Sequence, residues 1–351
     1  MSPTQRVKIV TNLRCNVRCQ FCYYGNCLSQ PNPPSNWVKA QLIYARKHGI
    51  KDVDFSGGEP TVRGDLINLV GYAKKMGFRK ICMITNGLIL SNESYARQLI
   101  QSGLNDVLFS IHGNRQELHD YLTQVPGSFQ KLLKAIENVK KEGINFRTNT
   151  VVTRANYKSL PQLAELLSAL KPKAVNFIKF NPWSFATMKV EEMAAKYSEI
   201  APYLKKAIDA LDSSVEKVTV RYIPFCFMQG YEQHVCDMRQ LRYDSDEWVP
   251  GVRDTLESGF IKHSKIIFGG LILCHPFERL RSFNPSELFD ETIVKLSQRG
   301  YLKRKDCQKC RYFQLCDGFE KSYVNLYGLG EVSPVIGKQI KDPMFFRRNY
   351  C

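Results

Sequence analysis

Short apolar runs alternate with amphipathic stretches through residues 7–180. The apolar runs predict six strands, at Val7–Thr11, Val53–Ser56, Ile81–Thr85, Val107–Ile111, Phe146–Val152 and Val175–Phe180. Between them, apolar residues recur at helical spacings of three and four, as in Phe129, Leu132, Leu133, Ile136 and Val139. Six strand–helix units in series predict a parallel sheet with right-handed crossovers. Because six units are too few to close an eight-stranded barrel, we expect an α/β fold, a partial (β/α)6 TIM-like barrel, with its active site at the carboxyl ends of the strands.

The pattern changes after residue 182. Residues Glu191–Leu211 predict a helix and Val218–Ile223 a strand. Lys265–Cys274, with Gly269-Gly270 at its centre, predicts a hairpin because Gly-Gly suits a tight primed turn, and Ser286–Arg299 predicts a short helix. We therefore expect three segments: a barrel core at 1–185, a connecting or substrate-covering region at 186–260, and a small C-terminal α+β extension at 261–351.

Composition and charge narrow the class of protein. The chain has 351 residues, of which 44% are hydrophobic and 24% charged, so it has ample material for a buried core. The net charge of +17 lies mainly in the N-terminal two-thirds and forms no dense run. It suits either an anionic partner or a solvated basic surface. No apolar stretch approaches the roughly 20 residues that span a bilayer, so we expect a cytoplasmic protein with no membrane partner.

Twelve cysteines are many for the reducing cytosol, where disulfides are rare and clustered thiols indicate metal binding or catalysis. Two groups are tightly spaced, Cys15-x3-Cys19-x2-Cys22 and Cys307-x2-Cys310-x5-Cys316. The first group directly follows the first predicted strand. Three thiolates can bind three irons of a [4Fe–4S] cube and leave the fourth iron open to a small molecule. Structural zinc prefers closed coordination by four ligands.

At these residues the chain resembles the radical S-adenosylmethionine (SAM) enzymes. Their signature is C-x3-C-x2-C after the first strand, with an aromatic residue before the last cysteine, here Phe21. A second family feature, a Gly-Gly-Glu-Pro turn after the second strand, stands here as Gly57-Gly58-Glu59-Pro60. The resemblance implies that Cys15, Cys19 and Cys22 hold the cluster, that Phe21 lies against the adenine of SAM and that the turn holds its amino group. Glycines allow close backbone approach, and Glu59 can accept charge-assisted hydrogen bonds from an ammonium.

Polar residues also stand at the ends of the later strands. The resemblance implies that they hold the carboxylate and ribose of SAM; they are Thr85, Asn86, Ser110, His112, Asn149 and Asn181. It further implies reductive cleavage of SAM to a 5′-deoxyadenosyl radical that abstracts a hydrogen atom from substrate. The electron for this cleavage would come from a donor such as flavodoxin or ferredoxin.

The second cysteine group resembles the C-terminal segment of the SPASM and twitch subgroups, which carry auxiliary [4Fe–4S] clusters. Cys274 matches their Gly-x4-Cys element, but Glu320 stands where the full pattern has a further cysteine. We therefore expect one auxiliary cluster, bound by Cys274, Cys307, Cys310 and Cys316. Cys226, Cys236 or Cys351 could replace one of these ligands. Four thiolates would suit zinc equally well, so a zinc site stays an alternative.

Cys226 has three possible roles: core residue, auxiliary ligand, or hydrogen-atom donor to a substrate radical, as in some radical SAM epimerases. Cys82, among apolar neighbours in a strand, is expected to be a buried structural thiol.

Three functions stay open. The first is modification of a small, anionic biosynthetic substrate by dehydrogenation, epimerisation or C–C or C–S bond formation. The second is modification of a peptide, although peptide-modifying relatives often carry an extra N-terminal domain and the first strand here begins at residue 7. The third is RNA modification, or a non-catalytic zinc-binding nucleic-acid module; the charge permits it, but no aromatic–basic RNA-binding motif is evident. The sequence leaves open the substrate, the net reaction, whether SAM is regenerated, and the oligomeric state.

Overall fold

The computed structural model describes residues 4–22, 24–25, 31–181, 190–211, 214–248, 292, 295 and 298–348. Its main sheet has seven parallel strands that are ordered as they follow one another along the chain. They are β1 (Arg6–Asn12), β2 (Asp52–Gly57), β3 (Lys80–Thr85), β4 (Asp106–Ser110), β5 (Phe146–Val152), β6 (Ala174–Lys179) and β7 (Lys217–Arg221). The six strands predicted for the barrel are all present, with ends that differ by at most one residue.

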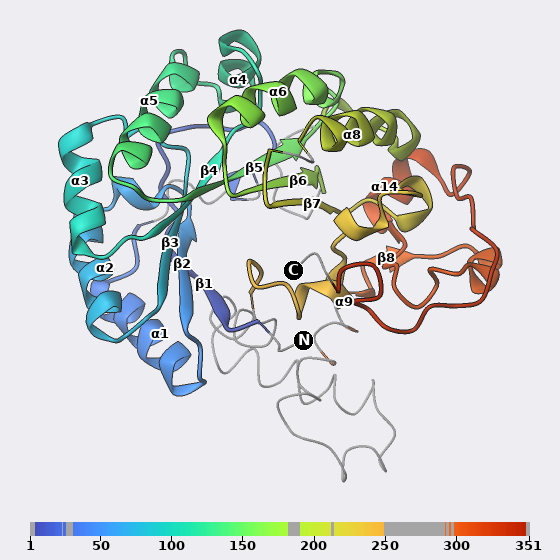
Figure 1. Cartoon of the computed structure of the whole chain (residues 1–351), viewed down its shortest axis with the longest axis horizontal. Coiled ribbons are helices and arrows are strands. Elements are labelled where there is room, and N and C mark those ends of the chain that lie inside the picture. The colour runs from blue at the N-terminus through green and yellow to red at the C-terminus, as the bar shows by residue number, and fades with distance from the viewer. Residues whose placement is uncertain are drawn as a thin grey trace.

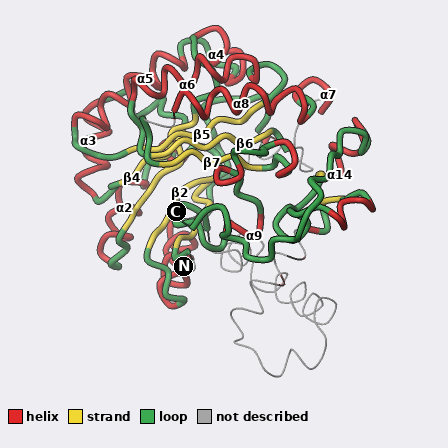
Figure 2. The backbone as a smooth tube through the Cα atoms, turned by 45° about the vertical axis from the view of Figure 1, so that its right-hand side comes forward, coloured by secondary structure: helices red, strands yellow, loops and turns green. Residues whose placement is uncertain are grey.

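Helices cover the convex outer face of this curved sheet, and the strands form the inner layer (Figures 1 and 2). They are α1 (Ser35–Lys47), α2 (Leu66–Lys75), α3 (Glu93–Ser102), α4 (Gln116–Thr123), α5 (Ser128–Lys141), α6 (Leu160–Leu170) and α8 (Tyr197–Leu211). Fully buried residues such as Phe55, Phe109 and Phe177 fill the space between the layers. The fold is therefore an open α/β barrel, as the alternation of strands and helices predicted.

Two elements differ from the sequence prediction. The strand predicted at Val218–Ile223 joins the barrel as β7, parallel to β6 with Ala174 opposite Lys217. The predicted helix Glu191–Leu211 is divided into α7 (Val190–Met193) and α8. The break occurs because the Ala194 carbonyl accepts hydrogen bonds from Arg154 Nε (2.9 Å) and the Tyr327 hydroxyl (3.0 Å), rather than from the next helical turn.

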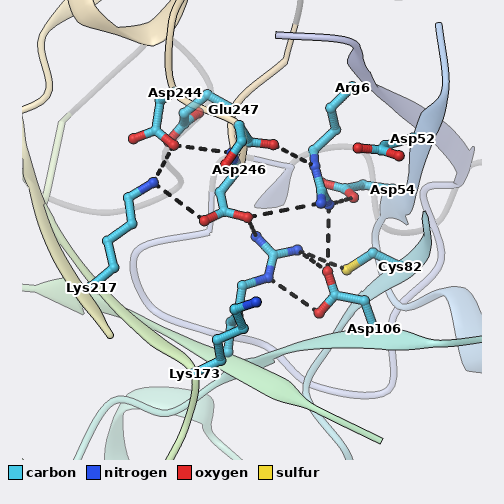
Figure 3. A network of polar contacts seen from close by, with 12 residues as sticks. Arg6, Asp52, Asp54, Cys82, Asp106, Lys173, Lys217, Asp244, Asp246 and Glu247 are labelled. Atoms are coloured by element: carbon cyan, nitrogen blue, oxygen red, sulfur yellow. Dashed lines mark hydrogen bonds and ion pairs between the residues drawn. The ribbon is translucent and has the colours of Figure 1, made fainter. Parts of the chain in front are cut away.

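A network of buried charges closes the barrel at the amino ends of its strands (Figure 3). From the strands, Arg6 Nη1 lies 2.5 Å from Asp54 Oδ1, and Arg147 Nη2 lies 2.7 Å from Asp106 Oδ2. A later segment adds Asp246, whose two carboxylate oxygens lie 3.4 Å from Arg147 Nη1 and 3.3 Å from Lys217 Nζ.

The segment that adds Asp246 is held at both edges of the open sheet. It pairs with β7 through a bridge between Val220 and Val235, and with the chain before β1 through a hydrogen bond from Thr4 N to Arg242 O (2.7 Å). It therefore crosses the gap between the first and last strands, and contains the one-turn helix α9 (Met238–Leu241). With this end of the barrel closed by charge, an active site is left to the opposite end.

The C-terminal region packs beside β7 (Figure 1). It contains β8 (Tyr301–Leu302), which pairs antiparallel with β9 (Phe319–Glu320), and the helix α14 (Lys321–Tyr327). Tyr323 of α14 stacks on Tyr197 of α8, with ring centroids 4.1 Å apart. The buried Lys179 amine lies about equally close to both rings, at 5.0 Å and 4.8 Å, and its burial lowers its pKa to about 8.

Some predictions fall on residues that the structure does not describe. The hairpin Lys265–Cys274 lies outside the described residues, and the helix Ser286–Arg299 is described only at 292, 295 and 298–299. The three segment boundaries stay predictions. Within the described ranges, every helix is too short or too polar to cross a bilayer.

Candidate active site

The first cysteine group lies where the sequence predicted, in the loop that follows β1 at the carboxyl end of the barrel. Cys15, Cys19 and Cys22 line one pocket of about 270 Å³. The end of α4 supports the loop, because Arg18 N donates to Thr123 O and Gln20 N donates to Leu122 O, both at 3.0 Å. The three thiols are therefore presented together by a loop whose backbone is hydrogen-bonded to a neighbouring helix.

The environment of these thiols suits a metal cluster. Burial raises the pKa of Cys15 to about 12, and burial with the neighbouring cysteines raises the pKa of Cys19 above its usual range. Three partly buried thiolates in one pocket need a compensating positive charge, which bound metal supplies. In the part of the chain that the structure describes, no three His, Cys, Asp or Glu side chains are grouped closely enough to hold a single ion. Three thiols that line one pocket are nevertheless the ligand set that can bind three irons of a [4Fe–4S] cube.

The Gly57-Gly58 turn touches the backbone of the cysteine loop. A Cβ atom on Gly58 would lie 2.1 Å from the Arg14 carbonyl oxygen, and one on Gly57 would lie 2.0 Å from that of Asn12. Gly57 also has a φ of +123°, a conformation that other residues rarely adopt. The turn is bonded to the loop, since Gly58 N donates to Asn12 O and Glu59 N donates to Arg14 O, both at 2.8 Å. Only glycine at both positions permits this approach.

Glu59 is 1% exposed and binds the turn to the end of β3. Its Oε1 accepts from Thr61 Oγ1 (2.6 Å), Thr61 N (3.1 Å) and Thr85 Oγ1 (2.8 Å), while Oε2 accepts from Asn86 N (2.8 Å). Burial raises the pKa of its carboxyl group, although these hydrogen bonds oppose the rise. Because Oε1 already has three donors, Oε2 is the atom with capacity left for a ligand ammonium.

The opposite wall of the pocket is aromatic and neutral. The Phe21 ring meets the His112 ring edge to face. His112 Nδ1 accepts a hydrogen bond from Val151 N (3.2 Å), so the neutral ring carries its proton on Nε2. Burial, and to a lesser extent His119, holds the pKa of His112 well below its usual value. The His112 ring therefore remains an uncharged donor at neutral pH.

The pocket brings together most of the residues that the sequence singled out for SAM. Its predicted members are Cys15, Cys19, Phe21, Cys22, Gly57, Gly58, Glu59, Thr85, Asn86, Ser110, His112 and Asn149. Pro60 is buried at the start of a short 3-10 helix and does not line the pocket. Asn181 does not line it either, and its Nδ2 lies 3.4 Å from the Tyr301 hydroxyl.

Sequence reasoning missed five residues that line the pocket. They are Val17, Ser56, Ile84, Thr123 and Val151. Ser56 and Ile84 lie on predicted strands, where alternation of side chains could have assigned them to the inner face. Thr123 follows from no local pattern, because only the folded chain brings the end of α4 to the cysteine loop.

A second cavity, of about 290 Å³, extends deeper into the barrel and shares Ser56, Ile84 and Asn149 with the first. Its wall carries both signs of charge. Arg221 Nη1 pairs with Glu247 Oε2 at 3.0 Å, and Lys8 Nζ lies 4.8 Å from the centroid of the Trp248 ring. The remaining lining residues are Tyr24, Asp54, Leu108, Asn176, Ile178 and Asp246.

A third cavity lies between β7 and the C-terminal region. It is lined by four cysteines, Cys226, Cys307, Cys310 and Cys316. Burial raises the pKa of Cys226 to about 11, with Cys310 and Cys307 contributing.

The other cysteines with a predicted role lie elsewhere. Cys236 is buried with its Sγ 3.8 Å from Asp244 Oδ2, outside the third cavity. Cys82 is buried, as predicted, with its Sγ 3.2 Å from Arg147 Nη2. Cys274 and Cys351, both named as candidate ligands, lie outside the described residues.

Comparison with known proteins agrees with this fold. The sequence model of the radical SAM superfamily matches residues 9–167. Fe-coproporphyrin III synthase of Methanosarcina barkeri is 31% identical over 349 residues, which cover 90% of this chain and 84% of that protein. The AdoMet-dependent heme synthase of Oleidesulfovibrio alaskensis is 33% identical over 162 residues, 44% of this chain and 41% of that protein. The probable GTP 3′,8-cyclase of Saccharolobus islandicus is 27% identical, with 58% of this chain matching 66% of its length. The matches thus span less than two thirds of the latter two proteins.

Solved structures share the fold at low sequence identity. Native anSMEcpe with bound AdoMet and Cp18Cys peptide has a TM-score of 0.59 at 16% identity, with 95% of this chain and 93% of that chain covered. Streptococcus suis SuiB bound to precursor peptide SuiA has a TM-score of 0.58 at 16% identity, with 99% and 76% covered. An open parallel barrel of this kind, with its sequence relatives, defines an enzyme that uses a [4Fe–4S] cluster and SAM. The chain belongs to the radical SAM superfamily.

Proposed function

We propose that this radical SAM enzyme abstracts a hydrogen atom from a small polar substrate bound in the cavity between Lys8 and Trp248. The observation that carries the proposal is that this cavity and the cysteine-lined pocket share Ser56, Ile84 and Asn149. A molecule in the deeper cavity therefore lies next to whatever fills the outer pocket. When bound, the cluster and SAM supply a 5′-deoxyadenosyl radical there.

The roles of the chain's own residues follow from their positions. Cys15, Cys19 and Cys22 hold the cluster, and the Gly57–Glu59 turn receives the amino group of SAM. Phe21 and His112 form the wall for its adenine, with the His112 Nε2–H as a neutral donor. The inner faces of the strands exclude bulk water from the reacting groups, since the charge network closes the other end of the barrel.

Charge and hydrogen-bonding capacity indicate the class of substrate. The net charge of +17 favours an anionic molecule. The cavity wall itself combines Lys8 and Arg221 with carboxylates, and the buried Asn149 Oδ1 has no hydrogen-bond partner in the structure. A small metabolite with one anionic group and several hydrogen-bonding groups satisfies both observations. The name of the relative that spans most of this chain, Fe-coproporphyrin III synthase, also gives a small-molecule product.

A peptide substrate is the second candidate, because two neighbours in fold were solved with peptides bound. At 16% identity those neighbours support the fold alone, so the small-molecule proposal is preferred. RNA has only the net charge in its favour. In each case a reduced protein such as flavodoxin or ferredoxin would supply the electron, and the thiols of the C-terminal region, Cys307, Cys310 and Cys316, would hold an auxiliary cluster like that of the SPASM and twitch subgroups.

The test begins with SAM cleavage. Anaerobically reconstituted enzyme, incubated with SAM and dithionite, should release 5′-deoxyadenosine, and Cys15→Ala, Cys19→Ala or Cys22→Ala should abolish this release. Cys82→Ala, which removes a buried thiol from the same barrel, is the matched control and should retain it. Absence of 5′-deoxyadenosine from the reconstituted wild-type enzyme would contradict the proposal.

The substrate class is tested by deuterium transfer into 5′-deoxyadenosine from labelled small anionic metabolites, peptides and tRNA. Transfer from the metabolites is expected. Lys8→Met should lower that transfer at least tenfold while SAM cleavage without substrate continues, whereas the surface variant Lys131→Met should change neither. Transfer from peptide or tRNA alone would overturn the substrate assignment.

A further inference from the structure

Cys226 lies in an unexpected place for a residue of the barrel. It belongs to a short 3-10 helix, Phe225–Phe227, that follows β7 after a turn at Tyr222, whose φ is +62°. The neighbouring Phe225 ring stacks on Tyr312 of the C-terminal region, with centroids 5.5 Å apart. This contact holds the Cys226 loop against the segment that carries Cys307, Cys310 and Cys316, and all four cysteines line one cavity.

We propose that Cys226, not Cys274, is the fourth ligand of the auxiliary [4Fe–4S] cluster, with Cys307, Cys310 and Cys316 as the other three. The inference deepens the proposed function, on which the identity of the metal as iron–sulfur rests. The fold brings four thiols to one cavity although Cys226 precedes the others by about eighty residues in the chain. Four cysteines are the ligand set that a cubane cluster requires.

The lining of the cavity fits a cluster. Apart from the thiols it is almost entirely apolar, formed by Pro224, Tyr312, Phe313, Phe319, Val332 and Pro334 with Gly318 and Lys303. Such walls exclude water from the sulfur atoms. Gly318 N donates a hydrogen bond to Cys316 Sγ at 3.3 Å, and hydrogen bonds of this kind to cluster sulfur adjust its reduction potential.

The radical SAM fold and cysteine pocket of this chain favour an iron–sulfur cluster here over a zinc ion, which four thiolates would bind in a compact tetrahedron. Four thiols distributed around a cavity suit a group that has a metal at each of four corners. Cys226 lines neither the cysteine pocket of the barrel nor the cavity between Lys8 and Trp248, so a role as a ligand suits its position better than a role as hydrogen-atom donor.

Two consequences follow for this enzyme. Each iron of the auxiliary cluster would have a protein thiolate, so none is left vacant to bind substrate. The cluster would also link the barrel to the C-terminal region, since Cys226 follows β7 and the other three ligands lie beyond β8.

The test isolates the auxiliary site in the full-length triple variant C15A/C19A/C22A, which lacks the ligands of the first cluster. After anaerobic reconstitution this variant should hold about four irons and four sulfides per chain. Adding Cys226→Ser should lower the iron content to about three, with the electron paramagnetic resonance signal of a three-iron cluster, or remove the cluster altogether. Adding Cys274→Ser, or the matched control Cys236→Ser, should leave about four irons in place.

Alkylation of the cysteines supplies a measurement that needs no substitution at Cys226. In the reconstituted triple variant, Cys226 should resist iodoacetamide together with Cys307, Cys310 and Cys316, and should react after an iron chelator removes the cluster. The inference is overturned if Cys226 is alkylated equally with and without iron, if Cys274→Ser rather than Cys226→Ser loses iron, or if zinc alone is bound. Because the triple variant needs no SAM cleavage, failure of the proposed function and failure of this ligand assignment give different results.

Discussion

The rings of Phe21 and His112 meet edge to face, with centroids 4.6 Å apart and an angle of 69° between their planes. Phe21 belongs to the cysteine loop after β1, whereas His112 follows β4 and is hydrogen-bonded to Val151 on β5. His119 of α4 stacks behind His112 at 5.9 Å. The aromatic wall of the cysteine pocket is therefore held by elements from three strand ends and one helix.

Removal of the His112 ring should weaken SAM binding. His112→Ala takes away an edge-to-face contact worth about 1 kcal/mol and a neutral hydrogen-bond donor, so we expect an affinity for SAM that is roughly tenfold lower. Iron content should not change, because His112 is not among the proposed cluster ligands. Anaerobic equilibrium dialysis measures the affinity, and the exposed-histidine variant His48→Ala is the control. Wild-type affinity in His112→Ala would remove His112 from the proposed SAM site.

Gly58→Ala should damage the cysteine pocket far more than its size suggests. The added Cβ would lie 2.1 Å from the Arg14 carbonyl oxygen and 2.5 Å from that of Leu13, so the cysteine loop has to move. We expect iron retention to fall severalfold and SAM binding to weaken by more than tenfold. Gly64→Ala is the matched control, because a Cβ there meets no atom within 4 Å. Equal iron content in the two variants would show that the loop tolerates displacement.

Asp246 should be important for stability. Its carboxylate neutralises Arg147 and Lys217 at the closed end of the barrel, and these cations outweigh burial to lower the pKa of Asp246. Asp246→Asn removes one negative charge from beside Arg147 and Lys217. The free energy of unfolding, measured in urea, should therefore fall by about 3 kcal/mol. The double variant Asp246→Asn/Lys217→Met should recover part of this loss.

The exposed pair Lys134–Glu137 is the control for Asp246, and Glu137→Gln should have a far smaller effect on unfolding. If Asp246→Asn and Glu137→Gln destabilise the protein equally, the charge network does not hold the barrel closed.

His119 should make the barrel sensitive to mild acid. Burial lowers its pKa to about 4, with Asp120 opposing the shift, and its Nδ1 accepts a hydrogen bond from His112 N at 3.2 Å. In the unfolded chain a histidine has a pKa of about 6.5, so it is protonated at a pH where the native His119 ring is still neutral. The stability of the native state therefore falls as the pH drops below about 6.5. Between pH 7 and pH 5, His119 should therefore lower the free energy of unfolding by about 2 kcal/mol.

Urea unfolding of the metal-free protein at the two pH values measures this effect. His119→Asn retains an acceptor but does not titrate, and should lose most of the pH dependence that His119 causes. An unchanged pH dependence in His119→Asn would assign the acid sensitivity to other groups.

Much of the fold follows from local pattern. A run such as Ile81–Thr85 is mostly apolar because both faces of a parallel sheet are covered, and turn and helix signals bound it on each side. Membership of β7 in the barrel was harder to predict, because Lys217, Thr219 and Arg221 on its inner face are polar, as in a strand exposed to solvent. In the folded chain these residues are buried, and the acidic segment after α9 pairs with Lys217 and Arg221.

In the candidate site, too, some residues follow from local motifs and others depend on the folded chain. The cysteine triad and the Gly-Gly-Glu-Pro turn are short motifs that local sequence makes visible, and the resemblance to the radical SAM enzymes implied that both contact one ligand; the structure places them at one pocket. Pro60 ends the second motif and Asn181 follows β6, but neither residue lines the pocket. Neighbours in sequence share a location, but only the direction of each side chain decides which of them reaches a ligand.

The sequence by itself determined the class of fold and marked the cysteine loop and the Gly-Gly-Glu-Pro turn as motifs, because each depends on residues within a few positions of one another. Tertiary structure alone decided that Thr123 lines the cysteine pocket, that Asp246 neutralises cations of the sheet, and that Cys226 joins Cys307, Cys310 and Cys316. The physical reason is chain closure: contacts between residues far apart in sequence form only when the packing of the sheet and its helices brings them together, and no local pattern records which distant segments will meet.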